Sequence, residues 1–301
     1  MQCRFQIVPV AGKGLGAVAT VAIAQGEWVL RDDPPLLRLG ATEMARFDHR
    51  WPCELRRSEE YIRAREKHFE APLQAQLREL SVPQQQAVLA LHSRQGSEGL
   101  AGIFFTNALP TEQEEDWVLC ETASRFNSSC QQNAVYQWSE RQSSASIRAV
   151  WDIPVGEEIS VFYGSTEQLL SPGVQRREFL SFWGFDCCCP ACSARGSDDN
   201  RRRIRELSAR LDGTEIVQLP MVERYSLAVT RLQLYQAEKL FFAGYFRALA
   251  ACVQLSQAAD APLAERRLWA EMALRHAQLF HAEDAALLDH CAAAVEASRD
   301  S

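Results

Sequence analysis

The stretch SRFNSSCQQNA, residues 124–134, places Cys130 midway between Asn127 and Asn133. It contains almost no side chain that could build a core, and it is too polar for a buried strand. Serine, asparagine and glutamine in this density favour caps and turns over the interior of a helix. The loop itself has no evident use for a thiol, so Cys130 indicates a partner elsewhere in the chain.

The overall composition is that of an ordinary globular protein. Of the 301 residues, 47% are hydrophobic and 24% are charged, as in soluble globular proteins. The length leaves room for about two domains. The net charge of -7 argues against a general binder of nucleic acid or of acidic membranes. It suits a basic partner, but simple solubility is the better explanation.

The expected compartment is a reducing one. No apolar stretch followed by a cleavage site is visible at the N-terminus, and no run approaches the ~18 apolar residues of a membrane span. We therefore expect a cytoplasmic or nuclear protein, in which disulfides are rare. Ten cysteines then require another explanation.

Four of the cysteines form the run CCCPAC at 187–192, and the other six are scattered singly. Cys187, Cys189 and Cys192 have the spacing C-x-C-x-x-C, and tetrahedral zinc takes four ligands, usually thiolate or imidazole. No histidine lies near this run, so Cys130 is the candidate for the fourth ligand and Cys188 for a spectator. Two alternatives remain, an iron–sulfur cluster and four buried free cysteines.

The first 194 residues predict a β-rich domain with a helical insertion. Strand-like runs occur in RFQIVPV, AVATVAIA and WVLRDDPPLL, with a Gly-rich turn at 12–16, and they indicate a β-meander. The segment 41–98 is helical in pattern, with helix starts predicted at Pro72 and Ser81. Strand composition returns in GIFFTNAL, NAVYQW, ASIRAVWDI and EEISVFYG.

The remainder, 195–301, predicts a helical domain. RGSDD (195–199) has the composition of a linker, and the sequence after residue 200 is helical throughout. Pro220 and Pro262 mark probable helix boundaries. We expect three to five helices in antiparallel pairs, and an α+β protein as a whole.

Four motifs, in order along residues 5–193, resemble the SET-domain protein lysine methyltransferases, especially the SET-and-MYND branch and fungal SET proteins. The opening Gly12-Lys13-Gly14-Leu15 with IAQGEWVL is similar to the family's G-x-G and strand pair. SRFNSSCQQNA is similar to S-R-x-N-H-S-C-x-P-N, and IPVGEEISVFYG to G-E-E-[IL]-x-x-x-Y. RREFLSFWGFDCCCPAC resembles the family's cysteine-rich tail. The MYND zinc finger is missing, because the insertion at 41–98 holds one cysteine and three histidines.

The resemblance implies a SET fold with a pseudoknot, a post-SET zinc site and a C-terminal helical domain. It implies that the loop of Asn127 joins the cofactor site to the zinc site through Cys130. The implied zinc ligands are Cys130, Cys187, Cys189 and Cys192. The residues implied to hold S-adenosylmethionine are Gly12, Lys13, Gly14, Asn107, Asn127, Ser128, Tyr163 and Phe185.

Tyr163 is the implied catalytic residue, because its hydroxyl can orient the lysine amine and the transferred methyl group. Phe182 and Trp183 are predicted to line the lysine channel or to belong to the core. Glu157 and Glu158 resemble a catalytic carboxylate pair, but we interpret them as turn and strand-edge residues.

The predicted function is S-adenosylmethionine-dependent methylation of lysine side chains in a histone or non-histone protein. The expected partner is a substrate protein with a basic, lysine-containing segment, and the expected state is a monomer that binds neither nucleic acid nor membrane. Ser128 stands where the family has histidine, and this departure keeps an alternative open, a catalytically silent scaffold that binds proteins through its helical half. Gln132 stands where the family has proline, which removes a rigid φ.

Overall fold

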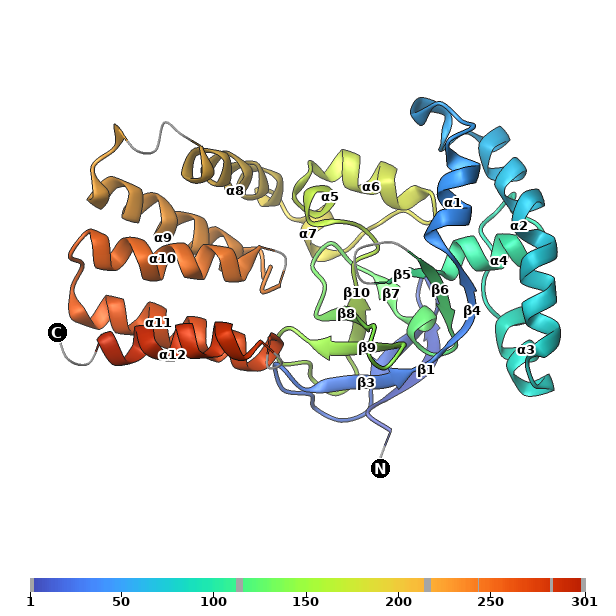
Figure 1. The fold of residues 1–301 in the computed structure, drawn as a ribbon, viewed down its shortest axis with the longest axis horizontal. Helices are drawn as coiled ribbons and strands as arrows, with labels where there is room; N and C mark the ends of the chain where they lie inside the picture. Colours follow the sequence, from blue (N-terminus) through green and yellow to red (C-terminus); the bar gives the residue numbers. More distant parts are fainter. Residues whose placement is uncertain (1–2, 112–115, 214–217, 243, 282–283, 299–301) are drawn as a thin grey trace.

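The computed structural model describes residues 3–111, 116–213, 218–242, 244–281 and 284–298. It combines strands and helices, which confirms the predicted α+β class. A central β region lies between the helical insertion on one side and the C-terminal helices on the other (Figure 1). In the described part of the chain, none of the helices is both long and apolar enough to cross a bilayer.

The strands are short and lie mostly in the first half of the chain. Their bounds are β1 (Phe5–Val10), β2 (Gly14–Ala19), β3 (Trp28–Asp33), β4 (Pro35–Leu39), β5 (Leu109–Pro110), β6 (Trp117–Cys120), β7 (Asn127–Ser128), β8 (Ala134–Ser139), β9 (Ser144–Ala149) and β10 (Glu158–Val161). They form three sheets of order β1-β2-β10-β7, β3-β9-β8 and β4-β6-β5. The predicted meander is therefore confirmed for β1 and β2, whereas β3 and β4 join separate sheets.

Two groups of helices flank the strands. Those of the insertion and the post-SET region are α1 (Ala41–Asp48), α2 (Glu59–Glu79), α3 (Val82–Leu89), α4 (Gly99–Asn107), α5 (Thr166–Leu170), α6 (Gly173–Ser181) and α7 (Pro190–Ser193), with short 3₁₀ turns η1 (Cys53–Leu55) and η3 (Ala123–Arg125). Those of the C-terminal half are α8 (Ser197–Asp212), α9 (Met221–Ala237), α10 (Tyr245–Ala258), α11 (Leu263–Phe280) and α12 (Ala285–Ala297).

The prediction of a strand in GIFFTNAL is wrong, because most of this run forms α4. Its aromatic and apolar residues favoured a strand, but the segment is buried on nearly all sides and packs against α2. The Glu70 carboxylate of α2 accepts hydrogen bonds from the backbone N–H groups of Leu100 (3.2 Å) and Ala101 (2.8 Å). These bonds satisfy donors that the first turn of a helix leaves unpaired, so tertiary contacts decide the helix.

Two further boundaries differ from the sequence predictions. Pro72 lies inside the 21-residue helix α2 instead of starting a helix. Residues 197–199 are the first turn of α8 and not a linker. Gly196, with a left-handed φ of 95°, directly precedes this helix. The boundaries at Pro220 and Pro262 are confirmed, because each proline directly precedes a helix.

The C-terminal helices pack in sequence order and share a core with the post-SET region. The largest contacts are α9 with α10, α10 with α11, and α11 with α12, as in a stack of helix pairs (Figure 1). One buried cluster includes Leu170, Cys187, Ile204 and Leu249. The cluster contains residues from both sides of the predicted domain boundary at 194/195. The division into two domains stays a prediction.

A buried arginine connects α8 to the loop of Cys130. Arg201 is 0% exposed and its Nε lies 3.0 Å from the Glu238 carboxylate. Its remaining nitrogens donate to the backbone oxygens of Leu169 (2.6 Å) and Cys130 (2.8 Å). A buried charge is tolerated only when it is paired and hydrogen-bonded in this way. The loop carrying Cys130 is thereby fixed to the helical half.

Candidate active site and metal centre

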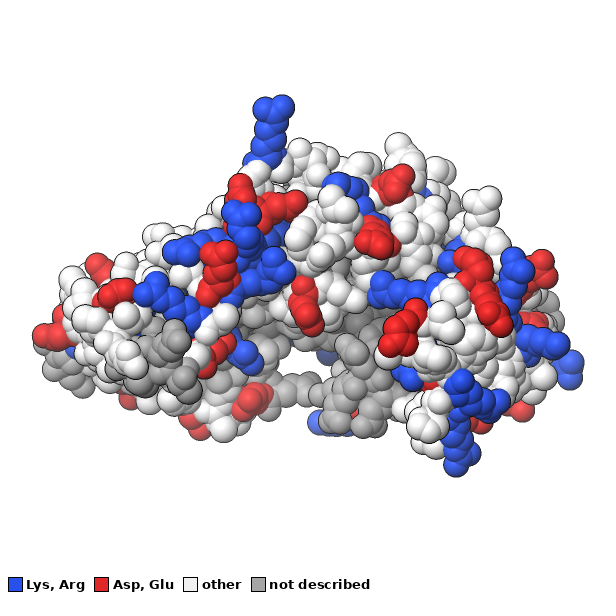
Figure 2. Space-filling model, turned by 90° about the horizontal axis from the view of Figure 1, so that it is seen from above, with Lys and Arg blue, Asp and Glu red and all other residues white. Residues whose placement is uncertain are grey.

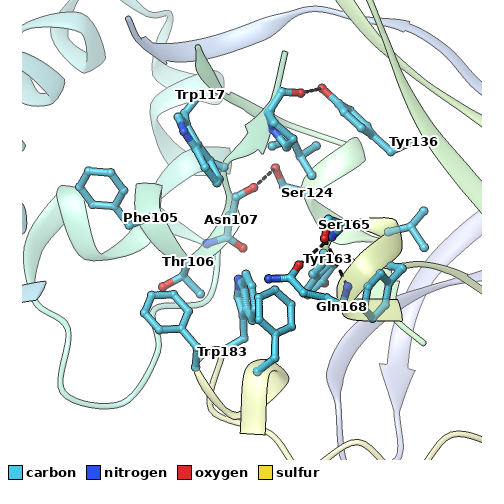
Figure 3. A pocket seen from close by; sticks show the side chains of 18 of the residues that line it. Phe105, Thr106, Asn107, Trp117, Ser124, Tyr136, Tyr163, Ser165, Gln168 and Trp183 are labelled. Carbon is cyan, nitrogen blue, oxygen red and sulfur yellow. Dashed lines mark hydrogen bonds between the residues drawn. The ribbon is translucent and has the colours of Figure 1, made fainter. Parts of the chain in front are cut away.

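Tyr163 follows β10 directly and lines a cavity of about 610 Å³, within the range of small-molecule sites (Figure 3). Its hydroxyl donates a 2.8 Å hydrogen bond to the backbone oxygen of Phe126. Burial and the nearby Glu158 charge raise the pKa of this hydroxyl above its ordinary value. The group therefore stays protonated at neutral pH, with its oxygen lone pairs available to accept a hydrogen bond.

Aromatic rings surround the Tyr163 side of the cavity. The Trp183 ring lies 5.4 Å from the Tyr163 ring, and Phe179 and Phe182 lie 5.3 Å and 5.1 Å from Trp183. All four line the same cavity. Phe182 and Trp183 line the cavity and also pack against two buried clusters, so the geometry is compatible with both predicted alternatives.

Ser128 occupies β7, which pairs in parallel with β10. It is 1% exposed, and its Oγ accepts a 3.3 Å hydrogen bond from the backbone N–H of Tyr163. The residue after it is also attached to β10, through a 2.8 Å bond from the Ser129 N–H to the Val161 oxygen. The loop thus lies against the strand that presents Tyr163, while the predicted pseudoknot crossing stays a prediction.

Glu158 organises the residues predicted for the cofactor. Its carboxylate lies 2.7 Å from the Lys13 ammonium and accepts a 2.9 Å hydrogen bond from Asn127 Nδ2. Asn127 also donates to the Leu15 oxygen (3.2 Å), and a Cβ added at Gly16 would lie 2.4 Å from the same nitrogen. The first hairpin and the loop 124–134 therefore meet through Glu158.

The glycines of the opening hairpin have a conformational role. Gly12 and Gly14 both adopt φ of +73°, and a Cβ at either would meet no described atom within 4 Å. The left-handed region is costly for other residues, so both positions favour glycine. The open space beside them leaves room for a ligand.

Asn107 ends α4 and lines the cavity. Its Nδ2 donates to the backbone oxygens of His92 (2.6 Å) and Ile103 (2.7 Å), and its own backbone oxygen accepts from Ser124 Oγ (3.0 Å). These bonds fix the side chain and leave the Oδ1 oxygen as the group that can contact a ligand.

The predicted cofactor residues are divided by the structure. Asn107 and Tyr163 line the cavity, whereas the rest do not, namely Gly12, Lys13, Gly14, Asn127, Ser128 and Phe185. Phe185 packs instead against the core of the C-terminal helices. Tyr163 therefore lines the cavity and also lies near the charge of Glu158.

The four cysteines singled out from the sequence converge. Their sulfur atoms all lie within 4.8 Å of one another, with Cys130 Sγ 3.9 Å from Cys187 and 3.6 Å from Cys192. Zn–S bonds of 2.3 Å in a tetrahedron require sulfur atoms about 3.8 Å apart. The donor set therefore fits one zinc ion, and the separations are far too long for disulfides.

The other cysteines do not join this centre. Cys188 is exposed and lies outside the cluster. Burial raises the pKa of Cys252 to about 12 and raises that of Cys120 as well, which keeps both as unreactive thiols. The distinction between Cys188 and its neighbours is the one that the alternating spacing predicted.

Positive charge surrounds the cysteine centre. Arg201, Arg177 and Arg176 donate to the backbone oxygens of Cys130 (2.8 Å), Cys192 (3.4 Å) and Ala191 (3.3 Å). Four thiolates around one zinc carry a net negative charge, so nearby guanidinium groups stabilise the site.

The comparisons with known proteins agree with this geometry. Residues 14–164, half of the chain, match the family model of the SET domain, and the chain belongs to this family. The histone-lysine N-methyltransferase set5 of Schizosaccharomyces pombe is 26% identical over 206 residues, which cover 68% of this chain and 53% of that protein. The N-lysine methyltransferase SMYD2-B of Danio rerio is 28% identical over 167 residues, which cover 54% and 35%.

These findings confirm the resemblance to the SET-and-MYND branch and to fungal SET proteins. They support a methyltransferase as the class of protein. The chain spans about half the length of one relative and about a third of the other.

Sequence reasoning missed the role of Glu158 as a shared partner. The signal was present in the dipeptide Glu157-Glu158, but Lys13 is 145 residues away and only the tertiary structure brings the two together. It also missed Asn133, whose side chain bonds the Ser160 N–H (2.8 Å), the Glu158 oxygen (2.8 Å) and the Glu157 carboxylate (2.9 Å). The two asparagines beside Cys130 therefore both attach the loop to β10.

Proposed function

We propose that the protein is a protein lysine methyltransferase that uses S-adenosylmethionine and carries one structural zinc ion. The observation that carries the proposal is the position of the Tyr163 hydroxyl. It is fixed by the Phe126 oxygen, held protonated, and lies where an aromatic cavity approaches the Asn127–Glu158 cluster.

The residues present fit the cofactor. Bound S-adenosylmethionine would supply an activated methyl group on a cationic sulfonium. Asn107 Oδ1 and the carbonyl-rich loop at 124–130 offer acceptors, which suit a cation, and Asn127 is already positioned by Glu158. The hairpin at 12–14 leaves open space for the methionine part.

The residues of the cavity would act on the substrate lysine. Its amine must be neutral to attack, although the ordinary lysine pKa is about 10.4. Enclosure between the Tyr163, Trp183 and Phe179 rings disfavours the charged form. The Tyr163 hydroxyl would then orient the amine, and the closed cavity would exclude water. Orientation of this kind supplies much of the acceleration in transfer reactions.

The cysteine centre would act structurally. Cys130 ties the loop of Asn127 and Ser128 to the segment 187–192, and Arg201 ties the same loop to α8. Zinc binding would therefore order the cofactor loop and the post-SET region together.

The silent-scaffold alternative depends on Ser128. Its hydroxyl bonds the Tyr163 backbone and the residue is fully enclosed, so the position is filled without the imidazole ring. This observation favours the enzyme over the scaffold.

Cofactor binding is the direct test of the proposal. S-adenosylmethionine should bind in calorimetry and raise the melting temperature, as any ligand selective for the folded state must. Asn127→Ala should lower cofactor affinity by roughly 10-fold, since a buried hydrogen-bonding group is worth about 1–2 kcal/mol. Gln131→Ala is the matched control, because its side chain belongs to the same loop but contacts the Glu238 oxygen instead of Glu158. An absence of binding at millimolar cofactor, together with no methyl transfer to a protein array, would favour the scaffold.

Glu158→Gln should weaken the cofactor site by removing the ion pair with Lys13 while keeping an oxygen for Asn127. Because both partners are largely shielded from solvent, we expect affinity for S-adenosylmethionine to fall by roughly 3- to 10-fold. Glu157→Gln is the control, since Glu157 instead contacts Asn133. Equal losses in the two variants, measured by calorimetry, would show that Glu158 has no particular role.

A further inference from the structure

The charged side chains that line the cavity of Tyr163 are all positive. Among its described lining residues, the charged side chains are Arg56, Arg57 and Arg65, and none is Asp or Glu. All three belong to the helical insertion, in the region from η1 to α2. The outer surface differs, because Figure 2 shows Lys and Arg interspersed with Asp and Glu over the end formed by the insertion.

Arg57 lies a short distance along the cavity wall from Tyr163. The Tyr163 and Trp183 rings are 5.4 Å apart, and the Trp183 and Phe179 rings are 5.3 Å apart. The Arg57 guanidinium carbon lies 5.2 Å from the centre of the Phe179 ring. An extended peptide advances about 3.3 Å per residue. A side chain within roughly five residues of a lysine at Tyr163 would therefore reach Arg57.

These arginines have no carboxylate partner at ion-pair distance among the described residues. Arg56 donates to the backbone oxygens of Asp48 (3.0 Å) and Trp51 (3.4 Å). The Asp48 carboxylate is occupied by the Tyr61 hydroxyl, at 2.6 Å. Arg94 of the same insertion shows the contrast, because it pairs with Glu59 at 3.0 Å.

Arg65 is the most enclosed of the three. Its guanidinium lies 3.9 Å over the Phe105 ring and 5.3 Å over the Tyr61 ring. Its buried Nε has no hydrogen-bond partner in the described structure. An arginine stays charged even when burial lowers its pKa, as it does here. The cavity therefore contains a positive charge with no carboxylate at ion-pair distance in the described structure.

We propose that Arg56, Arg57 and Arg65 form an acidic-residue subsite, which selects a substrate segment with Asp or Glu close to the target lysine. This inference rests on the proposed function, since it assigns the substrate class of the same cavity. It differs from the basic segment expected from the net charge of -7. Distant surface charges are screened beyond about 8 Å at physiological salt, whereas charges lining the cavity act at contact distance.

Short peptides with a central lysine test the proposal. In one peptide, Glu occupies the second and third positions before and after the lysine. A second peptide has Ala at these positions, and a third has Arg. Binding is measured by fluorescence anisotropy without turnover. The wild type should bind the Glu peptide roughly 5-fold or more tightly than the Ala peptide, and the Arg peptide most weakly. The difference should shrink as salt rises.

Charge reversal at Arg57 identifies the subsite. Arg57→Glu should lose the preference for the Glu peptide or reverse it, and Arg57→Gln should reduce it. Arg57 is exposed, so both variants should fold. The control Arg202→Glu changes an exposed arginine of α8, already paired with Asp199 at 2.7 Å, and should leave the preference intact.

Residues 112–115, of sequence Glu-Gln-Glu-Glu, lie outside the described residues and follow the lining residue Pro110 in the chain. A variant with these three glutamates changed to Gln should keep the preference for the Glu peptide.

Tighter binding of the Arg peptide by wild type would overturn the proposal, as would identical behaviour of Arg57→Glu and Arg202→Glu. Binding preference without methyl transfer to any peptide would contradict only the proposed enzyme function. Methyl transfer without the preference would contradict only the subsite.

Discussion

Cys130→Ser is expected to release the zinc ion and to lower the melting temperature by many degrees. Four sulfur atoms within 4.8 Å form a site that requires all of its ligands. Structural zinc contributes on the order of 10 kcal/mol to the folding of small zinc domains, so partial loss here should cost several kcal/mol. Metal content by mass spectrometry and melting by differential scanning fluorimetry measure the two effects.

The loss should also reach the cofactor. Cys130 lies three residues after Asn127, and its backbone oxygen accepts the Arg201 hydrogen bond. Without the metal the loop loses its attachment to the segment 187–192, so affinity for S-adenosylmethionine should fall as well. Cys187→Ser should behave alike, which would show that the two segments act as one centre.

Two serine controls separate metal loss from ordinary destabilisation. Cys188→Ser alters an exposed thiol outside the cluster and should be nearly neutral. Cys252→Ser places a hydroxyl in a buried site of α10 and should cost about 1–3 kcal/mol without loss of metal. Full zinc content in Cys130→Ser would mean that the link between the loop and the post-SET segment is wrong.

Tyr163→Phe is expected to lower the rate of methyl transfer by roughly 10²-fold or more. It removes one hydroxyl and leaves the ring that contacts Trp183. Loss of a single preorganised hydrogen-bonding group has an effect of this size when the group acts in the transition state. Stability should fall by only about 1 kcal/mol, through the lost bond to the Phe126 oxygen. Cofactor affinity should change little.

Tyr136→Phe provides the matched control. Its hydroxyl also donates to a backbone oxygen at 2.8 Å, that of Pro110, and its ring lines the same cavity. Its effect on the rate should be far smaller, since its hydroxyl bonds the Pro110 oxygen and not an atom of the loop that carries Asn127. Equal activity of wild type and Tyr163→Phe would contradict the catalytic assignment even though the fold belongs to the SET family.

The pH dependence adds a second readout to the Tyr163 variant. The rate should rise with pH across the neutral range, because only the neutral lysine amine attacks. Burial and Glu158 raise the pKa of Tyr163, so this hydroxyl does not titrate in that range. The increase of the methyl-transfer rate with pH should therefore persist in Tyr163→Phe.

Ser128→His examines the departure from the family motif. Ser128 is 1% exposed, so an imidazole there must displace its neighbours, at a cost of about 1–3 kcal/mol. We expect an active wild type and no gain from the histidine. An inactive wild type with an active Ser128→His would support the scaffold.

The sequence by itself determined the class of fold and the four cysteines that converge, and it predicted Tyr163 as the catalytic residue. These depend on local signals, such as the C-x-C-x-x-C spacing, the short strands with Gly and Pro between them, and the four ordered motifs. Spacing of ligands within one short run is preserved when the chain folds, which is why Cys187, Cys189 and Cys192 could be selected and Cys188 set aside.

Tertiary structure alone decided the helix α4, the partners of Glu158 and the charge of the cavity. The segment GIFFTNAL has strand-forming residues, but capping by Glu70 and burial against α2 make it helical. Lys13 and Glu158 are 145 residues apart, and Arg57 lies between η1 and α2 whereas Tyr163 lies between β10 and α5. Burial, ion pairing and the charge that lines a cavity depend on distances through space, which local sequence patterns do not contain.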